Sequence, residues 1–155
     1  MIRRAPWFIA IERDSFVALD MRLGLEEACP GSRIDTLPNA SDLADFLASG
    51  GLPDPARAVP VVLTSLSLER IDEAGLEQLL DGRGAIIVQR EGPDPVDRVS
   101  ARGYLHLPSP FNSDDFRTLR DALNERLQNG AAGASSGPAA CPSTVEPETQ
   151  STERS

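Results

Sequence analysis

The chain has 155 residues, of which 40% are hydrophobic, and its 24 acidic and 15 basic side chains give a net charge of -9 at pH 7. This length and apolar content fit one globular domain with a sizeable core. A surface of this charge repels phosphate backbones and anionic lipid heads, so neither nucleic acid nor a membrane is an expected partner. Every basic residue is an arginine, which excludes chemistry that depends on a lysine of this chain.

The two cysteines, Cys29 and Cys141, have no spacing that suggests a metal site, and Cys141 lies in a polar segment. Neither a disulfide framework nor a zinc site is indicated. We therefore expect no metal and no cofactor, and a cytoplasmic location, because a reducing compartment fits unpaired thiols.

Short apolar runs alternate with helical patterns in the first half of the chain. WFIAI at residues 7–11 predicts a strand, and Ser15 then opens a helix. RIDTL at 33–37 predicts a weaker strand, and Ser41 is expected to cap a short helix that stops at residues 49–51. The first helix has a broad apolar face: Phe16, Leu19 and Leu23, with Val17, Met21, Leu25 and Ala28.

The second half begins with the strongest strand signal, VPVVLT at 59–64. A helix over 68–80, a strand at 85–88 and an irregular stretch at 91–103 with at most one short helix at 95–101 follow. YLHL at 104–107 predicts a fifth strand. Ser113 is expected to cap a last helix with the apolar line Phe116, Leu119, Leu123 and Leu127.

Five strands alternating with about five helices predict an α/β fold of the flavodoxin-like type, a three-layer sandwich around a parallel sheet. The simplest strand order is 2-1-3-4-5. This domain occupies residues 1–128. Residues 129–155 are rich in Gly, Ala, Ser, Pro, Thr and Glu with one branched aliphatic side chain, so we expect a disordered tail.

In such a sheet a site forms where the carboxyl ends of the strands meet. The residues that follow strands 1, 3, 4 and 5 are therefore the candidates for a site. They are Glu12, Arg13 and Asp14, then Thr64 and Ser65, then Gln89, and finally Ser109.

Two segments carry a resemblance to a known family. FIAIERDSFVALDMRLGLEEA (8–28) resembles the opening of response-regulator receiver domains, where a strand ends in an acidic cluster and runs into a helix. SPFNSDDFRTLRDAL (109–123) resembles their end, where a Lys-Pro-Phe corner precedes the last helix. The resemblance implies a place in two-component signalling, by phosphotransfer from a histidine kinase.

The family's chemistry needs an acceptor aspartate, a divalent metal held by acids after strand 1, a hydroxyl after strand 4 and a lysine after strand 5. In this sequence the acceptor position falls on Ser65, the hydroxyl on Gln89 and the lysine on Ser109, while Arg13 replaces one acid. Only Glu12 and Asp14 keep a negative charge. The resemblance therefore implies a degenerate receiver that is not phosphorylated.

Enzymatic alternatives have weaker support. Ser65 as a phosphate acceptor lacks a cation clamp, and a hydrolase built on Ser65 and His106 lacks the G-x-S-x-G turn. Two interpretations of Arg13 stay open: it pairs with Glu12 or Asp14 and fills the metal's place, or it points to solvent.

We expect an interaction or regulatory module that binds a protein: a histidine kinase, a phosphotransfer protein or a downstream regulator. The resemblance implies two surfaces, the first helix and the face of helix 4, strand 5 and helix 5, through which a homodimer is also conceivable. Candidates on that second face are Tyr104, His106, Arg117, Arg120 and Asp121. The alternative is a receiver-like module that binds a small ligand, which an open cleft around Ser65 and Gln89 would favour.

Overall fold

The computed structural model describes residues 4–90, 94–108 and 111–136. The chain divides into two compact units, residues 1–120 and 121–155. The sheet and all the candidate residues except Asp121 belong to the first unit. Within the described residues, no helix combines the length and the apolar character needed to cross a membrane.

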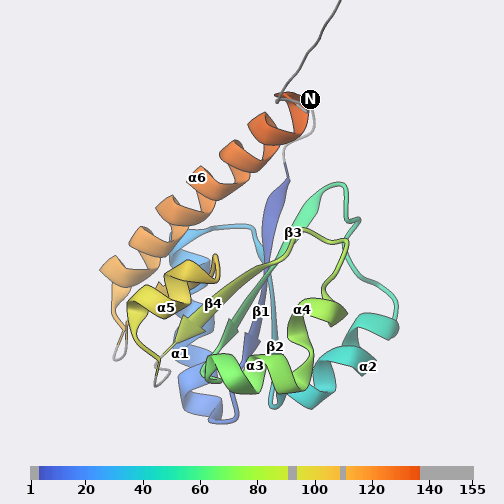
Figure 1. Ribbon diagram of the computed structural model, residues 1–155. Coiled ribbons are helices and arrows are strands. Elements are labelled where there is room, and N and C mark those ends of the chain that lie inside the picture. The colour runs from blue at the N-terminus through green and yellow to red at the C-terminus, as the bar shows by residue number, and fades with distance from the viewer. Residues whose placement is uncertain (1–3, 91–93, 109–110, 137–155) are drawn as a thin grey trace, which may run out of the picture. The chain divides into compact units, whose positions relative to one another are not determined.

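The described residues form one parallel five-stranded sheet in the order β2-β1-β3-β4-β5 (Figure 1). This confirms the predicted α/β fold and strand order. The apolar β1, β3 and β4 lie in the middle, as strands covered on both faces must. The strand bounds are β1 (Ala5–Ile11), β2 (Arg33–Leu37), β3 (Ala58–Thr64), β4 (Ile86–Arg90) and β5 (Leu105–Leu107).

Helices connect successive strands, as right-handed crossovers in a parallel sheet require. Helices α2, α3 and α4 lie together on one side of the sheet (Figure 1). The helical elements are α1 (Ser15–Ala28), the 3₁₀ turn η1 (Ala40–Asp42), α2 (Leu43–Ala48), α3 (Leu68–Ala74), α4 (Leu76–Leu79), α5 (Val96–Ala101) and α6 (Ser113–Ser136).

One face of the sheet packs on α2 to α5 through a continuous apolar cluster. Alternate residues of β1 point into it, and Trp7 is the largest of them. The Trp7 indole N–H donates to Asp35 Oδ2 at 2.7 Å, so its polar edge is satisfied. The cluster comprises Trp7, Ile9, Ile11, Leu43, Val62, Leu68, Ile71, Leu76, Leu80, Ile87, Val99 and Tyr104.

The predicted single helix over 68–80 is wrong, because the structure has two helices there. Gly75 separates α3 from α4 with φ 67° and ψ 33°, a left-handed conformation that glycine adopts without a steric penalty. Its backbone N–H donates to the carbonyls of Ile71 and Asp72, which closes α3.

Two predicted helix caps are also wrong. Ser41 lies inside η1, and Ser113 is the first residue of α6 rather than its cap. The cap of α6 is Asn112: its Oδ1 accepts from the Asp115 N–H at 3.1 Å, and Asp115 Oδ2 accepts from the Asn112 N–H at 2.8 Å. This reciprocal pair is a capping box one residue earlier than expected.

Helix α6 continues through residues 129–136, into the segment for which we expected disorder. Residues 137–155 lie outside the described residues. The prediction of a disordered tail therefore stays a prediction.

The apolar face of α1 is divided between the interior and solvent. Met21 and Leu25 are fully buried, as is most of Ala28. In contrast, Phe16 is 80% exposed, Leu23 54% and Leu19 52%. The helix therefore buries only the side that meets the sheet, and its outer side carries an apolar stripe.

Gly24 fixes how closely α1 approaches α6. A Cβ atom at this position would lie 2.4 Å from two ring carbons of Phe116, which is itself 3% exposed. Gly24→Ala normally stabilises a helix by about 1 kcal/mol. Here we expect a net loss on the order of 1–3 kcal/mol, because the ring must move from a packed position. Chemical denaturation measures the change.

The control for this substitution is a double-mutant cycle with Phe116→Leu. The smaller side chain makes room for the added methyl group, so Gly24→Ala should cost less, or stabilise, in the Phe116→Leu background. An equal loss in both backgrounds would contradict a steric role for Gly24.

Candidate functional site

The carboxyl end of β1 provides two acidic side chains, and both are engaged by the protein itself. Asp14 caps α1: its Oδ1 accepts from the N–H groups of Phe16 at 2.9 Å and Val17 at 3.3 Å. Glu12 Oε2 accepts from the Asp14 N–H at 2.9 Å. The turn between β1 and α1 is therefore held by its own carboxylates.

The other oxygen of Glu12 forms an ion pair with Arg90, the last residue of β4. The two side chains are 11% and 6% exposed, respectively. A charge this well shielded from water needs a partner of opposite sign, and each residue supplies it for the other. The pair links β1 to β4 across the end of the intervening β3.

Of the two interpretations of Arg13, pairing with a neighbouring acid or pointing to solvent, the structure is closer to the second. Its guanidinium donates to Asn39 Oδ1 at 3.2 Å, and the residue is exposed. Among the described residues it forms no ion pair with Glu12 or Asp14. The neighbouring acid is instead neutralised by Arg90, which the sequence analysis did not single out.

The carboxyl end of β3 places Thr64 and Ser65 in contrasting environments. Thr64 is 1% exposed, and its Oγ1 accepts from the Leu66 N–H at 3.2 Å. Ser65, which we expected at the position of a receiver's acceptor, is exposed. No hydrogen bond joins its hydroxyl to a base within the described part of the chain, so nothing there activates it as a nucleophile.

Gln89 lies beside Thr64 in the sheet and is fully buried. Its Nε2 donates to the Leu66 carbonyl at 3.0 Å and to Asp94 Oδ2 at 2.9 Å. The amide therefore ties the end of β4 to the segments after β3 and β4. Its Oε1 has no hydrogen-bond partner among the described residues. This is unusual, because most buried side-chain oxygens accept at least one hydrogen bond.

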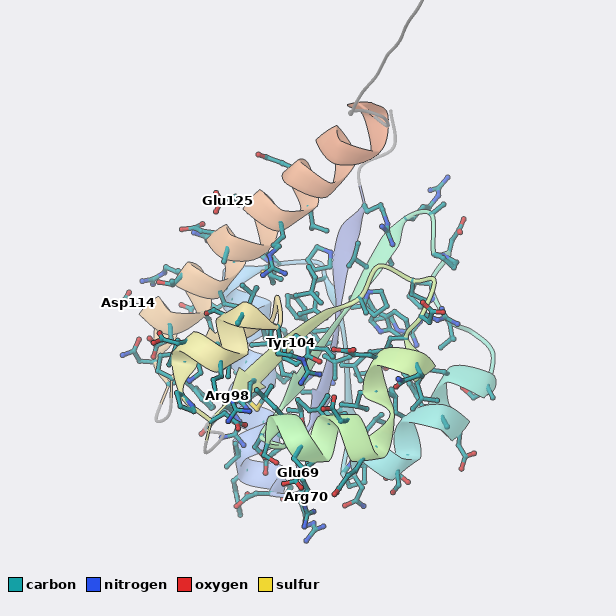
Figure 2. All side chains as sticks on the ribbon, viewed as in Figure 1. Glu69, Arg70, Arg98, Tyr104, Asp114 and Glu125 are labelled. Carbon is teal, nitrogen blue, oxygen red and sulfur yellow. The ribbon has the colours of Figure 1, made fainter. Side chains whose placement is uncertain are left out.

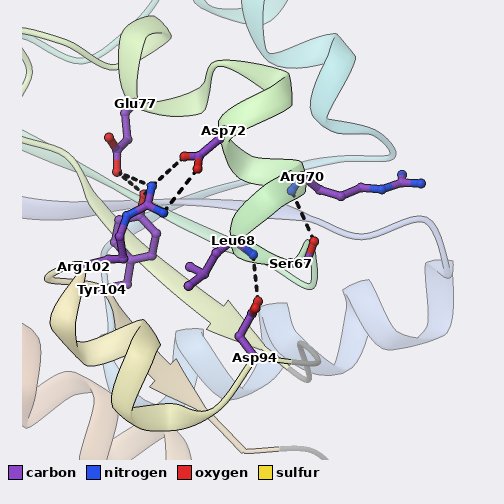
Figure 3. A network of polar contacts seen from close by, with 8 residues as sticks. All are labelled: Ser67, Leu68, Arg70, Asp72, Glu77, Asp94, Arg102 and Tyr104. Atoms are coloured by element: carbon purple, nitrogen blue, oxygen red, sulfur yellow. Dashed lines mark hydrogen bonds and ion pairs between the residues drawn. The ribbon is translucent and has the colours of Figure 1, made fainter.

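Asp94 joins this network to α3. Its Oδ2 accepts from the Leu68 N–H at 2.7 Å, at the start of a helix that Ser67 caps through the Arg70 N–H (Figure 3). The hydrogen bond from Leu68, and next that from Gln89, hold the pKa of Asp94 below its usual value. The ionised carboxylate is thus the form that the fold stabilises.

Ser109, which we expected at the position of a receiver's lysine, lies outside the described residues. The other predicted rim residues come from the ends of three adjacent strands: Glu12, Arg13 and Asp14 after β1, Ser65 after β3, and Gln89 in β4. No three His, Cys, Asp or Glu side chains among the described residues group as metal ligands would.

A hollow of about 330 Å³ lies next to this edge, between α1 and the end of β2. Its apolar lining comes from Ala18, Leu19, Leu37 and Pro38. The polar lining comprises Glu12, Arg13, Ser15, Arg22 and Thr36. The hollow is therefore not the cleft around Ser65 and Gln89 that would favour a ligand there.

The predicted second face starts with Tyr104, which is buried and directed inward, whereas Glu69 and Arg70 project outward from α3 (Figure 2). The Tyr104 hydroxyl donates to Glu77 Oε2 and accepts from Arg102 Nη2 at 3.0 Å (Figure 3). Burial, and next the hydrogen bond with Glu77, raise the pKa of Tyr104 to about 12.

Arg102 completes this network and covers the tyrosine. Its Nη2 lies 2.6 Å from Asp72 Oδ1 and 3.2 Å from Glu77 Oε2, and its guanidinium carbon is 5.1 Å from the Tyr104 ring centre. The pKa of Arg102 is raised, chiefly by the hydrogen bond to Asp72. The network joins α3 and α4 to β5, so Tyr104 holds elements together.

The remaining candidates of that face differ in exposure. His106 is half-buried and pairs with Gln89 in the sheet register. Arg117 is exposed and pairs with Asp114. Arg120 donates to the Ala28 carbonyl at 3.5 Å, which directs it towards α1. Asp121 is exposed and belongs to the second unit, so the structure does not place it with the others.

Comparisons with models of known families, with curated proteins and with solved structures found no match.

Removing the Arg90 cation should leave Glu12 uncompensated. We expect Arg90→Met to lower the free energy of unfolding by about 3 kcal/mol, because a shielded carboxylate then lacks its partner. Adding Glu12→Gln should recover part of this loss, since the amide still accepts from the Asp14 N–H. Urea denaturation followed by Trp7 fluorescence measures both variants.

The matched control is Arg13→Met, which removes an exposed guanidinium at the same edge of the sheet, two residues after the end of β1. Its effect should stay within about 0.5 kcal/mol. A loss at Arg13 that equals the loss at Arg90 would show that Arg13 neutralises the pocket.

Tyr104 is the single tyrosine, so phenolate absorbance titrates it directly. In the folded chain we expect a midpoint near pH 12, and near 10 when the chain is unfolded in urea. A folded pKa above the unfolded one contributes stability below pH 10, and this contribution is lost as the pH rises through the folded value. Glu77→Gln should lower the folded midpoint. A midpoint near 10 while circular dichroism still reports a folded chain would contradict the burial of Tyr104.

Proposed function

We propose that this chain is a pseudo-receiver: a receiver-like module that binds proteins in two-component signalling without being phosphorylated. The observation that carries the proposal is the ion pair of Glu12 with Arg90 at the carboxyl end of the sheet. Glu12 is the acid that would correspond to part of a receiver's metal-binding cluster, and here it is paired with an arginine of the same chain.

The other acid at that position supports the same proposal. Asp14 is the N-cap of α1 and accepts two backbone hydrogen bonds. A divalent cation would have to compete with these donors for Asp14 and with a guanidinium for Glu12. The arrangement favours a pocket that is neutralised from within.

Phosphoryl transfer also needs a nucleophile and a charge clamp. Ser65 is exposed and has no adjacent base among the described residues. The chain contains no lysine to neutralise the phosphoryl oxygens. A module of this kind acts through its surfaces, with a histidine kinase, a phosphotransfer protein or a downstream regulator as the partner.

A second candidate function is binding of a small ligand at the altered edge. One observation favours it: the buried Oε1 of Gln89 has no hydrogen-bond donor among the described residues, and a ligand N–H or O–H would satisfy it. The ion pair and the position of the hollow away from Gln89 favour the interaction module instead.

The proposal predicts that the chain stays unmodified by a phosphodonor. Incubation with acetyl phosphate and magnesium should leave the intact mass unchanged, because the expected acceptor position holds Ser65, Glu12 and Asp14 are engaged within the protein, and the sequence has no lysine. A receiver with its acceptor aspartate, treated in the same mixture, is the positive control.

Ser65→Ala separates the remaining outcomes. A gain of one phosphate that survives this substitution and is labile to hydroxylamine would reveal an aspartyl phosphate and overturn the proposal. A gain that the substitution abolishes would assign a phosphoserine to Ser65 and overturn it as well.

A further inference from the structure

The hollow between α1 and the end of β2 has two facing sides. On α1 it is lined by Ser15, Ala18, Leu19 and Arg22, and their spacing of three and four residues places them on one side of the helix. Residues 36–38 line it from β2. Its volume of about 330 Å³ is at the lower end of the volumes of small-molecule sites. The size of the hollow therefore suits a small ligand.

Two arginines belong to the lining of this hollow. The Arg13 guanidinium donates to Asn39 Oδ1 at 3.2 Å, which directs it to the β2 side of α1. Arg22 Nε lies 3.4 Å from Glu26 Oε2, and the Arg22 guanidinium donates no hydrogen bond within the described part of the chain. A guanidinium has five N–H donors, so both arginines have donors left for a ligand.

The acids closest to these arginines are engaged within the protein or lie on another side of α1. Glu12 lines the hollow, but one of its oxygens pairs with Arg90 and the other accepts from the Asp14 N–H. Asp14 is outside the lining, and its Oδ1 accepts from two N–H groups at the start of α1, where the helix dipole also offsets its charge. Asp20 lies two positions from Ala18, and hence on the other side of the helix. The free donors of the hollow therefore favour an anion.

The apolar part of the lining offers contact to the body of a ligand. It consists of Ala18, Leu19, Leu37 and Pro38. Leu19 is 52% exposed, so a ligand packed on it removes apolar surface from water. A guanidinium binds a carboxylate through two parallel hydrogen bonds, and the planes of the two groups match. The combination of arginines and aliphatic side chains suits a carboxylate on an apolar ring.

We propose that this hollow binds a small organic anion, a carboxylate carried by an apolar ring. The ring packs against Leu19 and Leu37, and the carboxylate meets Arg13 and Arg22. The site is separate from the buried Oε1 of Gln89, a residue outside the lining. The inference does not depend on whether the chain is a pseudo-receiver.

Titration of the full chain with cinnamate, followed by its backbone amide NMR signals, tests the site. Cinnamate is a planar carboxylate on one aromatic ring. Because both arginines are partly exposed, we expect a dissociation constant in the micromolar to millimolar range. The signals that shift and saturate should include those of Ser15, Ala18, Leu19, Thr36 and Leu37. Shifts that do not saturate, or that are confined to other parts of the chain, would overturn the proposal.

Two further probes separate the charge from the ring. Cinnamamide, the neutral amide of the same shape, should bind roughly tenfold more weakly, because it lacks the charge that the guanidinium groups recognise. Acetate has the carboxylate without the ring, and it should also bind roughly tenfold more weakly. Equal binding of cinnamate and cinnamamide would contradict a role for the arginines.

Substitution of the arginines tests the same point in the protein. Arg13→Gln and Arg22→Gln should each weaken cinnamate roughly three- to tenfold, and the double variant should bind cinnamate and cinnamamide equally. Arg70→Gln is the matched control, because Arg70 projects outward from α3 (Figure 2) and should leave both constants unchanged. A double variant that still prefers the carboxylate would overturn the proposal. Glu26→Gln removes the acid that competes for Arg22, so it should tighten cinnamate, and weaker binding would contradict the place of Arg22.

Leu19 and Leu23 provide a matched pair for the ring. They are 52% and 54% exposed on the same helix, but only Leu19 lines the hollow. Leu19→Ala should weaken cinnamate roughly threefold, and Leu23→Ala should leave it unchanged. An equal loss for the two variants would place the ring on the outer side of α1 and overturn the proposal. Circular dichroism shows whether each variant stays folded.

Discussion

The ion pair between Glu12 and Arg90 joins parts of the sheet that are not neighbours. Arg90 ends β4 and Glu12 follows β1, and β3 runs between these strands. Both side chains are shielded from water, and each gives the other a partner of opposite charge. Glu12 also accepts from the Asp14 N–H, and Asp14 caps α1. The start of α1 and the end of β4 are therefore coupled through one carboxylate.

The strands could be predicted from the sequence because apolar runs and turn residues are local signals. The observed β2 has the expected bounds, and the order of the sheet is one of the few that right-handed crossovers allow. Local signals also explain the errors. Gly75 marks the break between α3 and α4, but its left-handed conformation depends on how the flanking turns pack. The cap at Asn112 lies one residue from the predicted one, within the ambiguity of adjacent polar residues.

The candidate site was less predictable, because it depends on side chains that meet across the sheet. The positions of Glu12, Asp14, Ser65 and Gln89 at the carboxyl edge follow from topology. Topology does not show which arginine neutralises Glu12, because Arg13 is adjacent to it in sequence whereas Arg90 is adjacent to it in space. Arg90 did carry a signal: a charged residue at the end of a buried strand, at the same edge as the other candidates. Periodicity likewise defined the apolar residues of α1 without showing that Phe16, Leu19 and Leu23 face away from the sheet.

The use of arginine in these two networks has a physical reason. Arg102 contacts Asp72, Glu77 and the Tyr104 ring at once, which a planar fork of donors can do and a lysine ammonium cannot. The same geometry suits Arg90 at the sheet's edge, where the cation is held in place by Glu12. A receiver's lysine must instead be available to meet a phosphoryl group. A guanidinium fixed by an internal carboxylate stabilises one state of the fold, which supports the proposal that this chain acts through its surface rather than through a change of charge at the edge of the sheet.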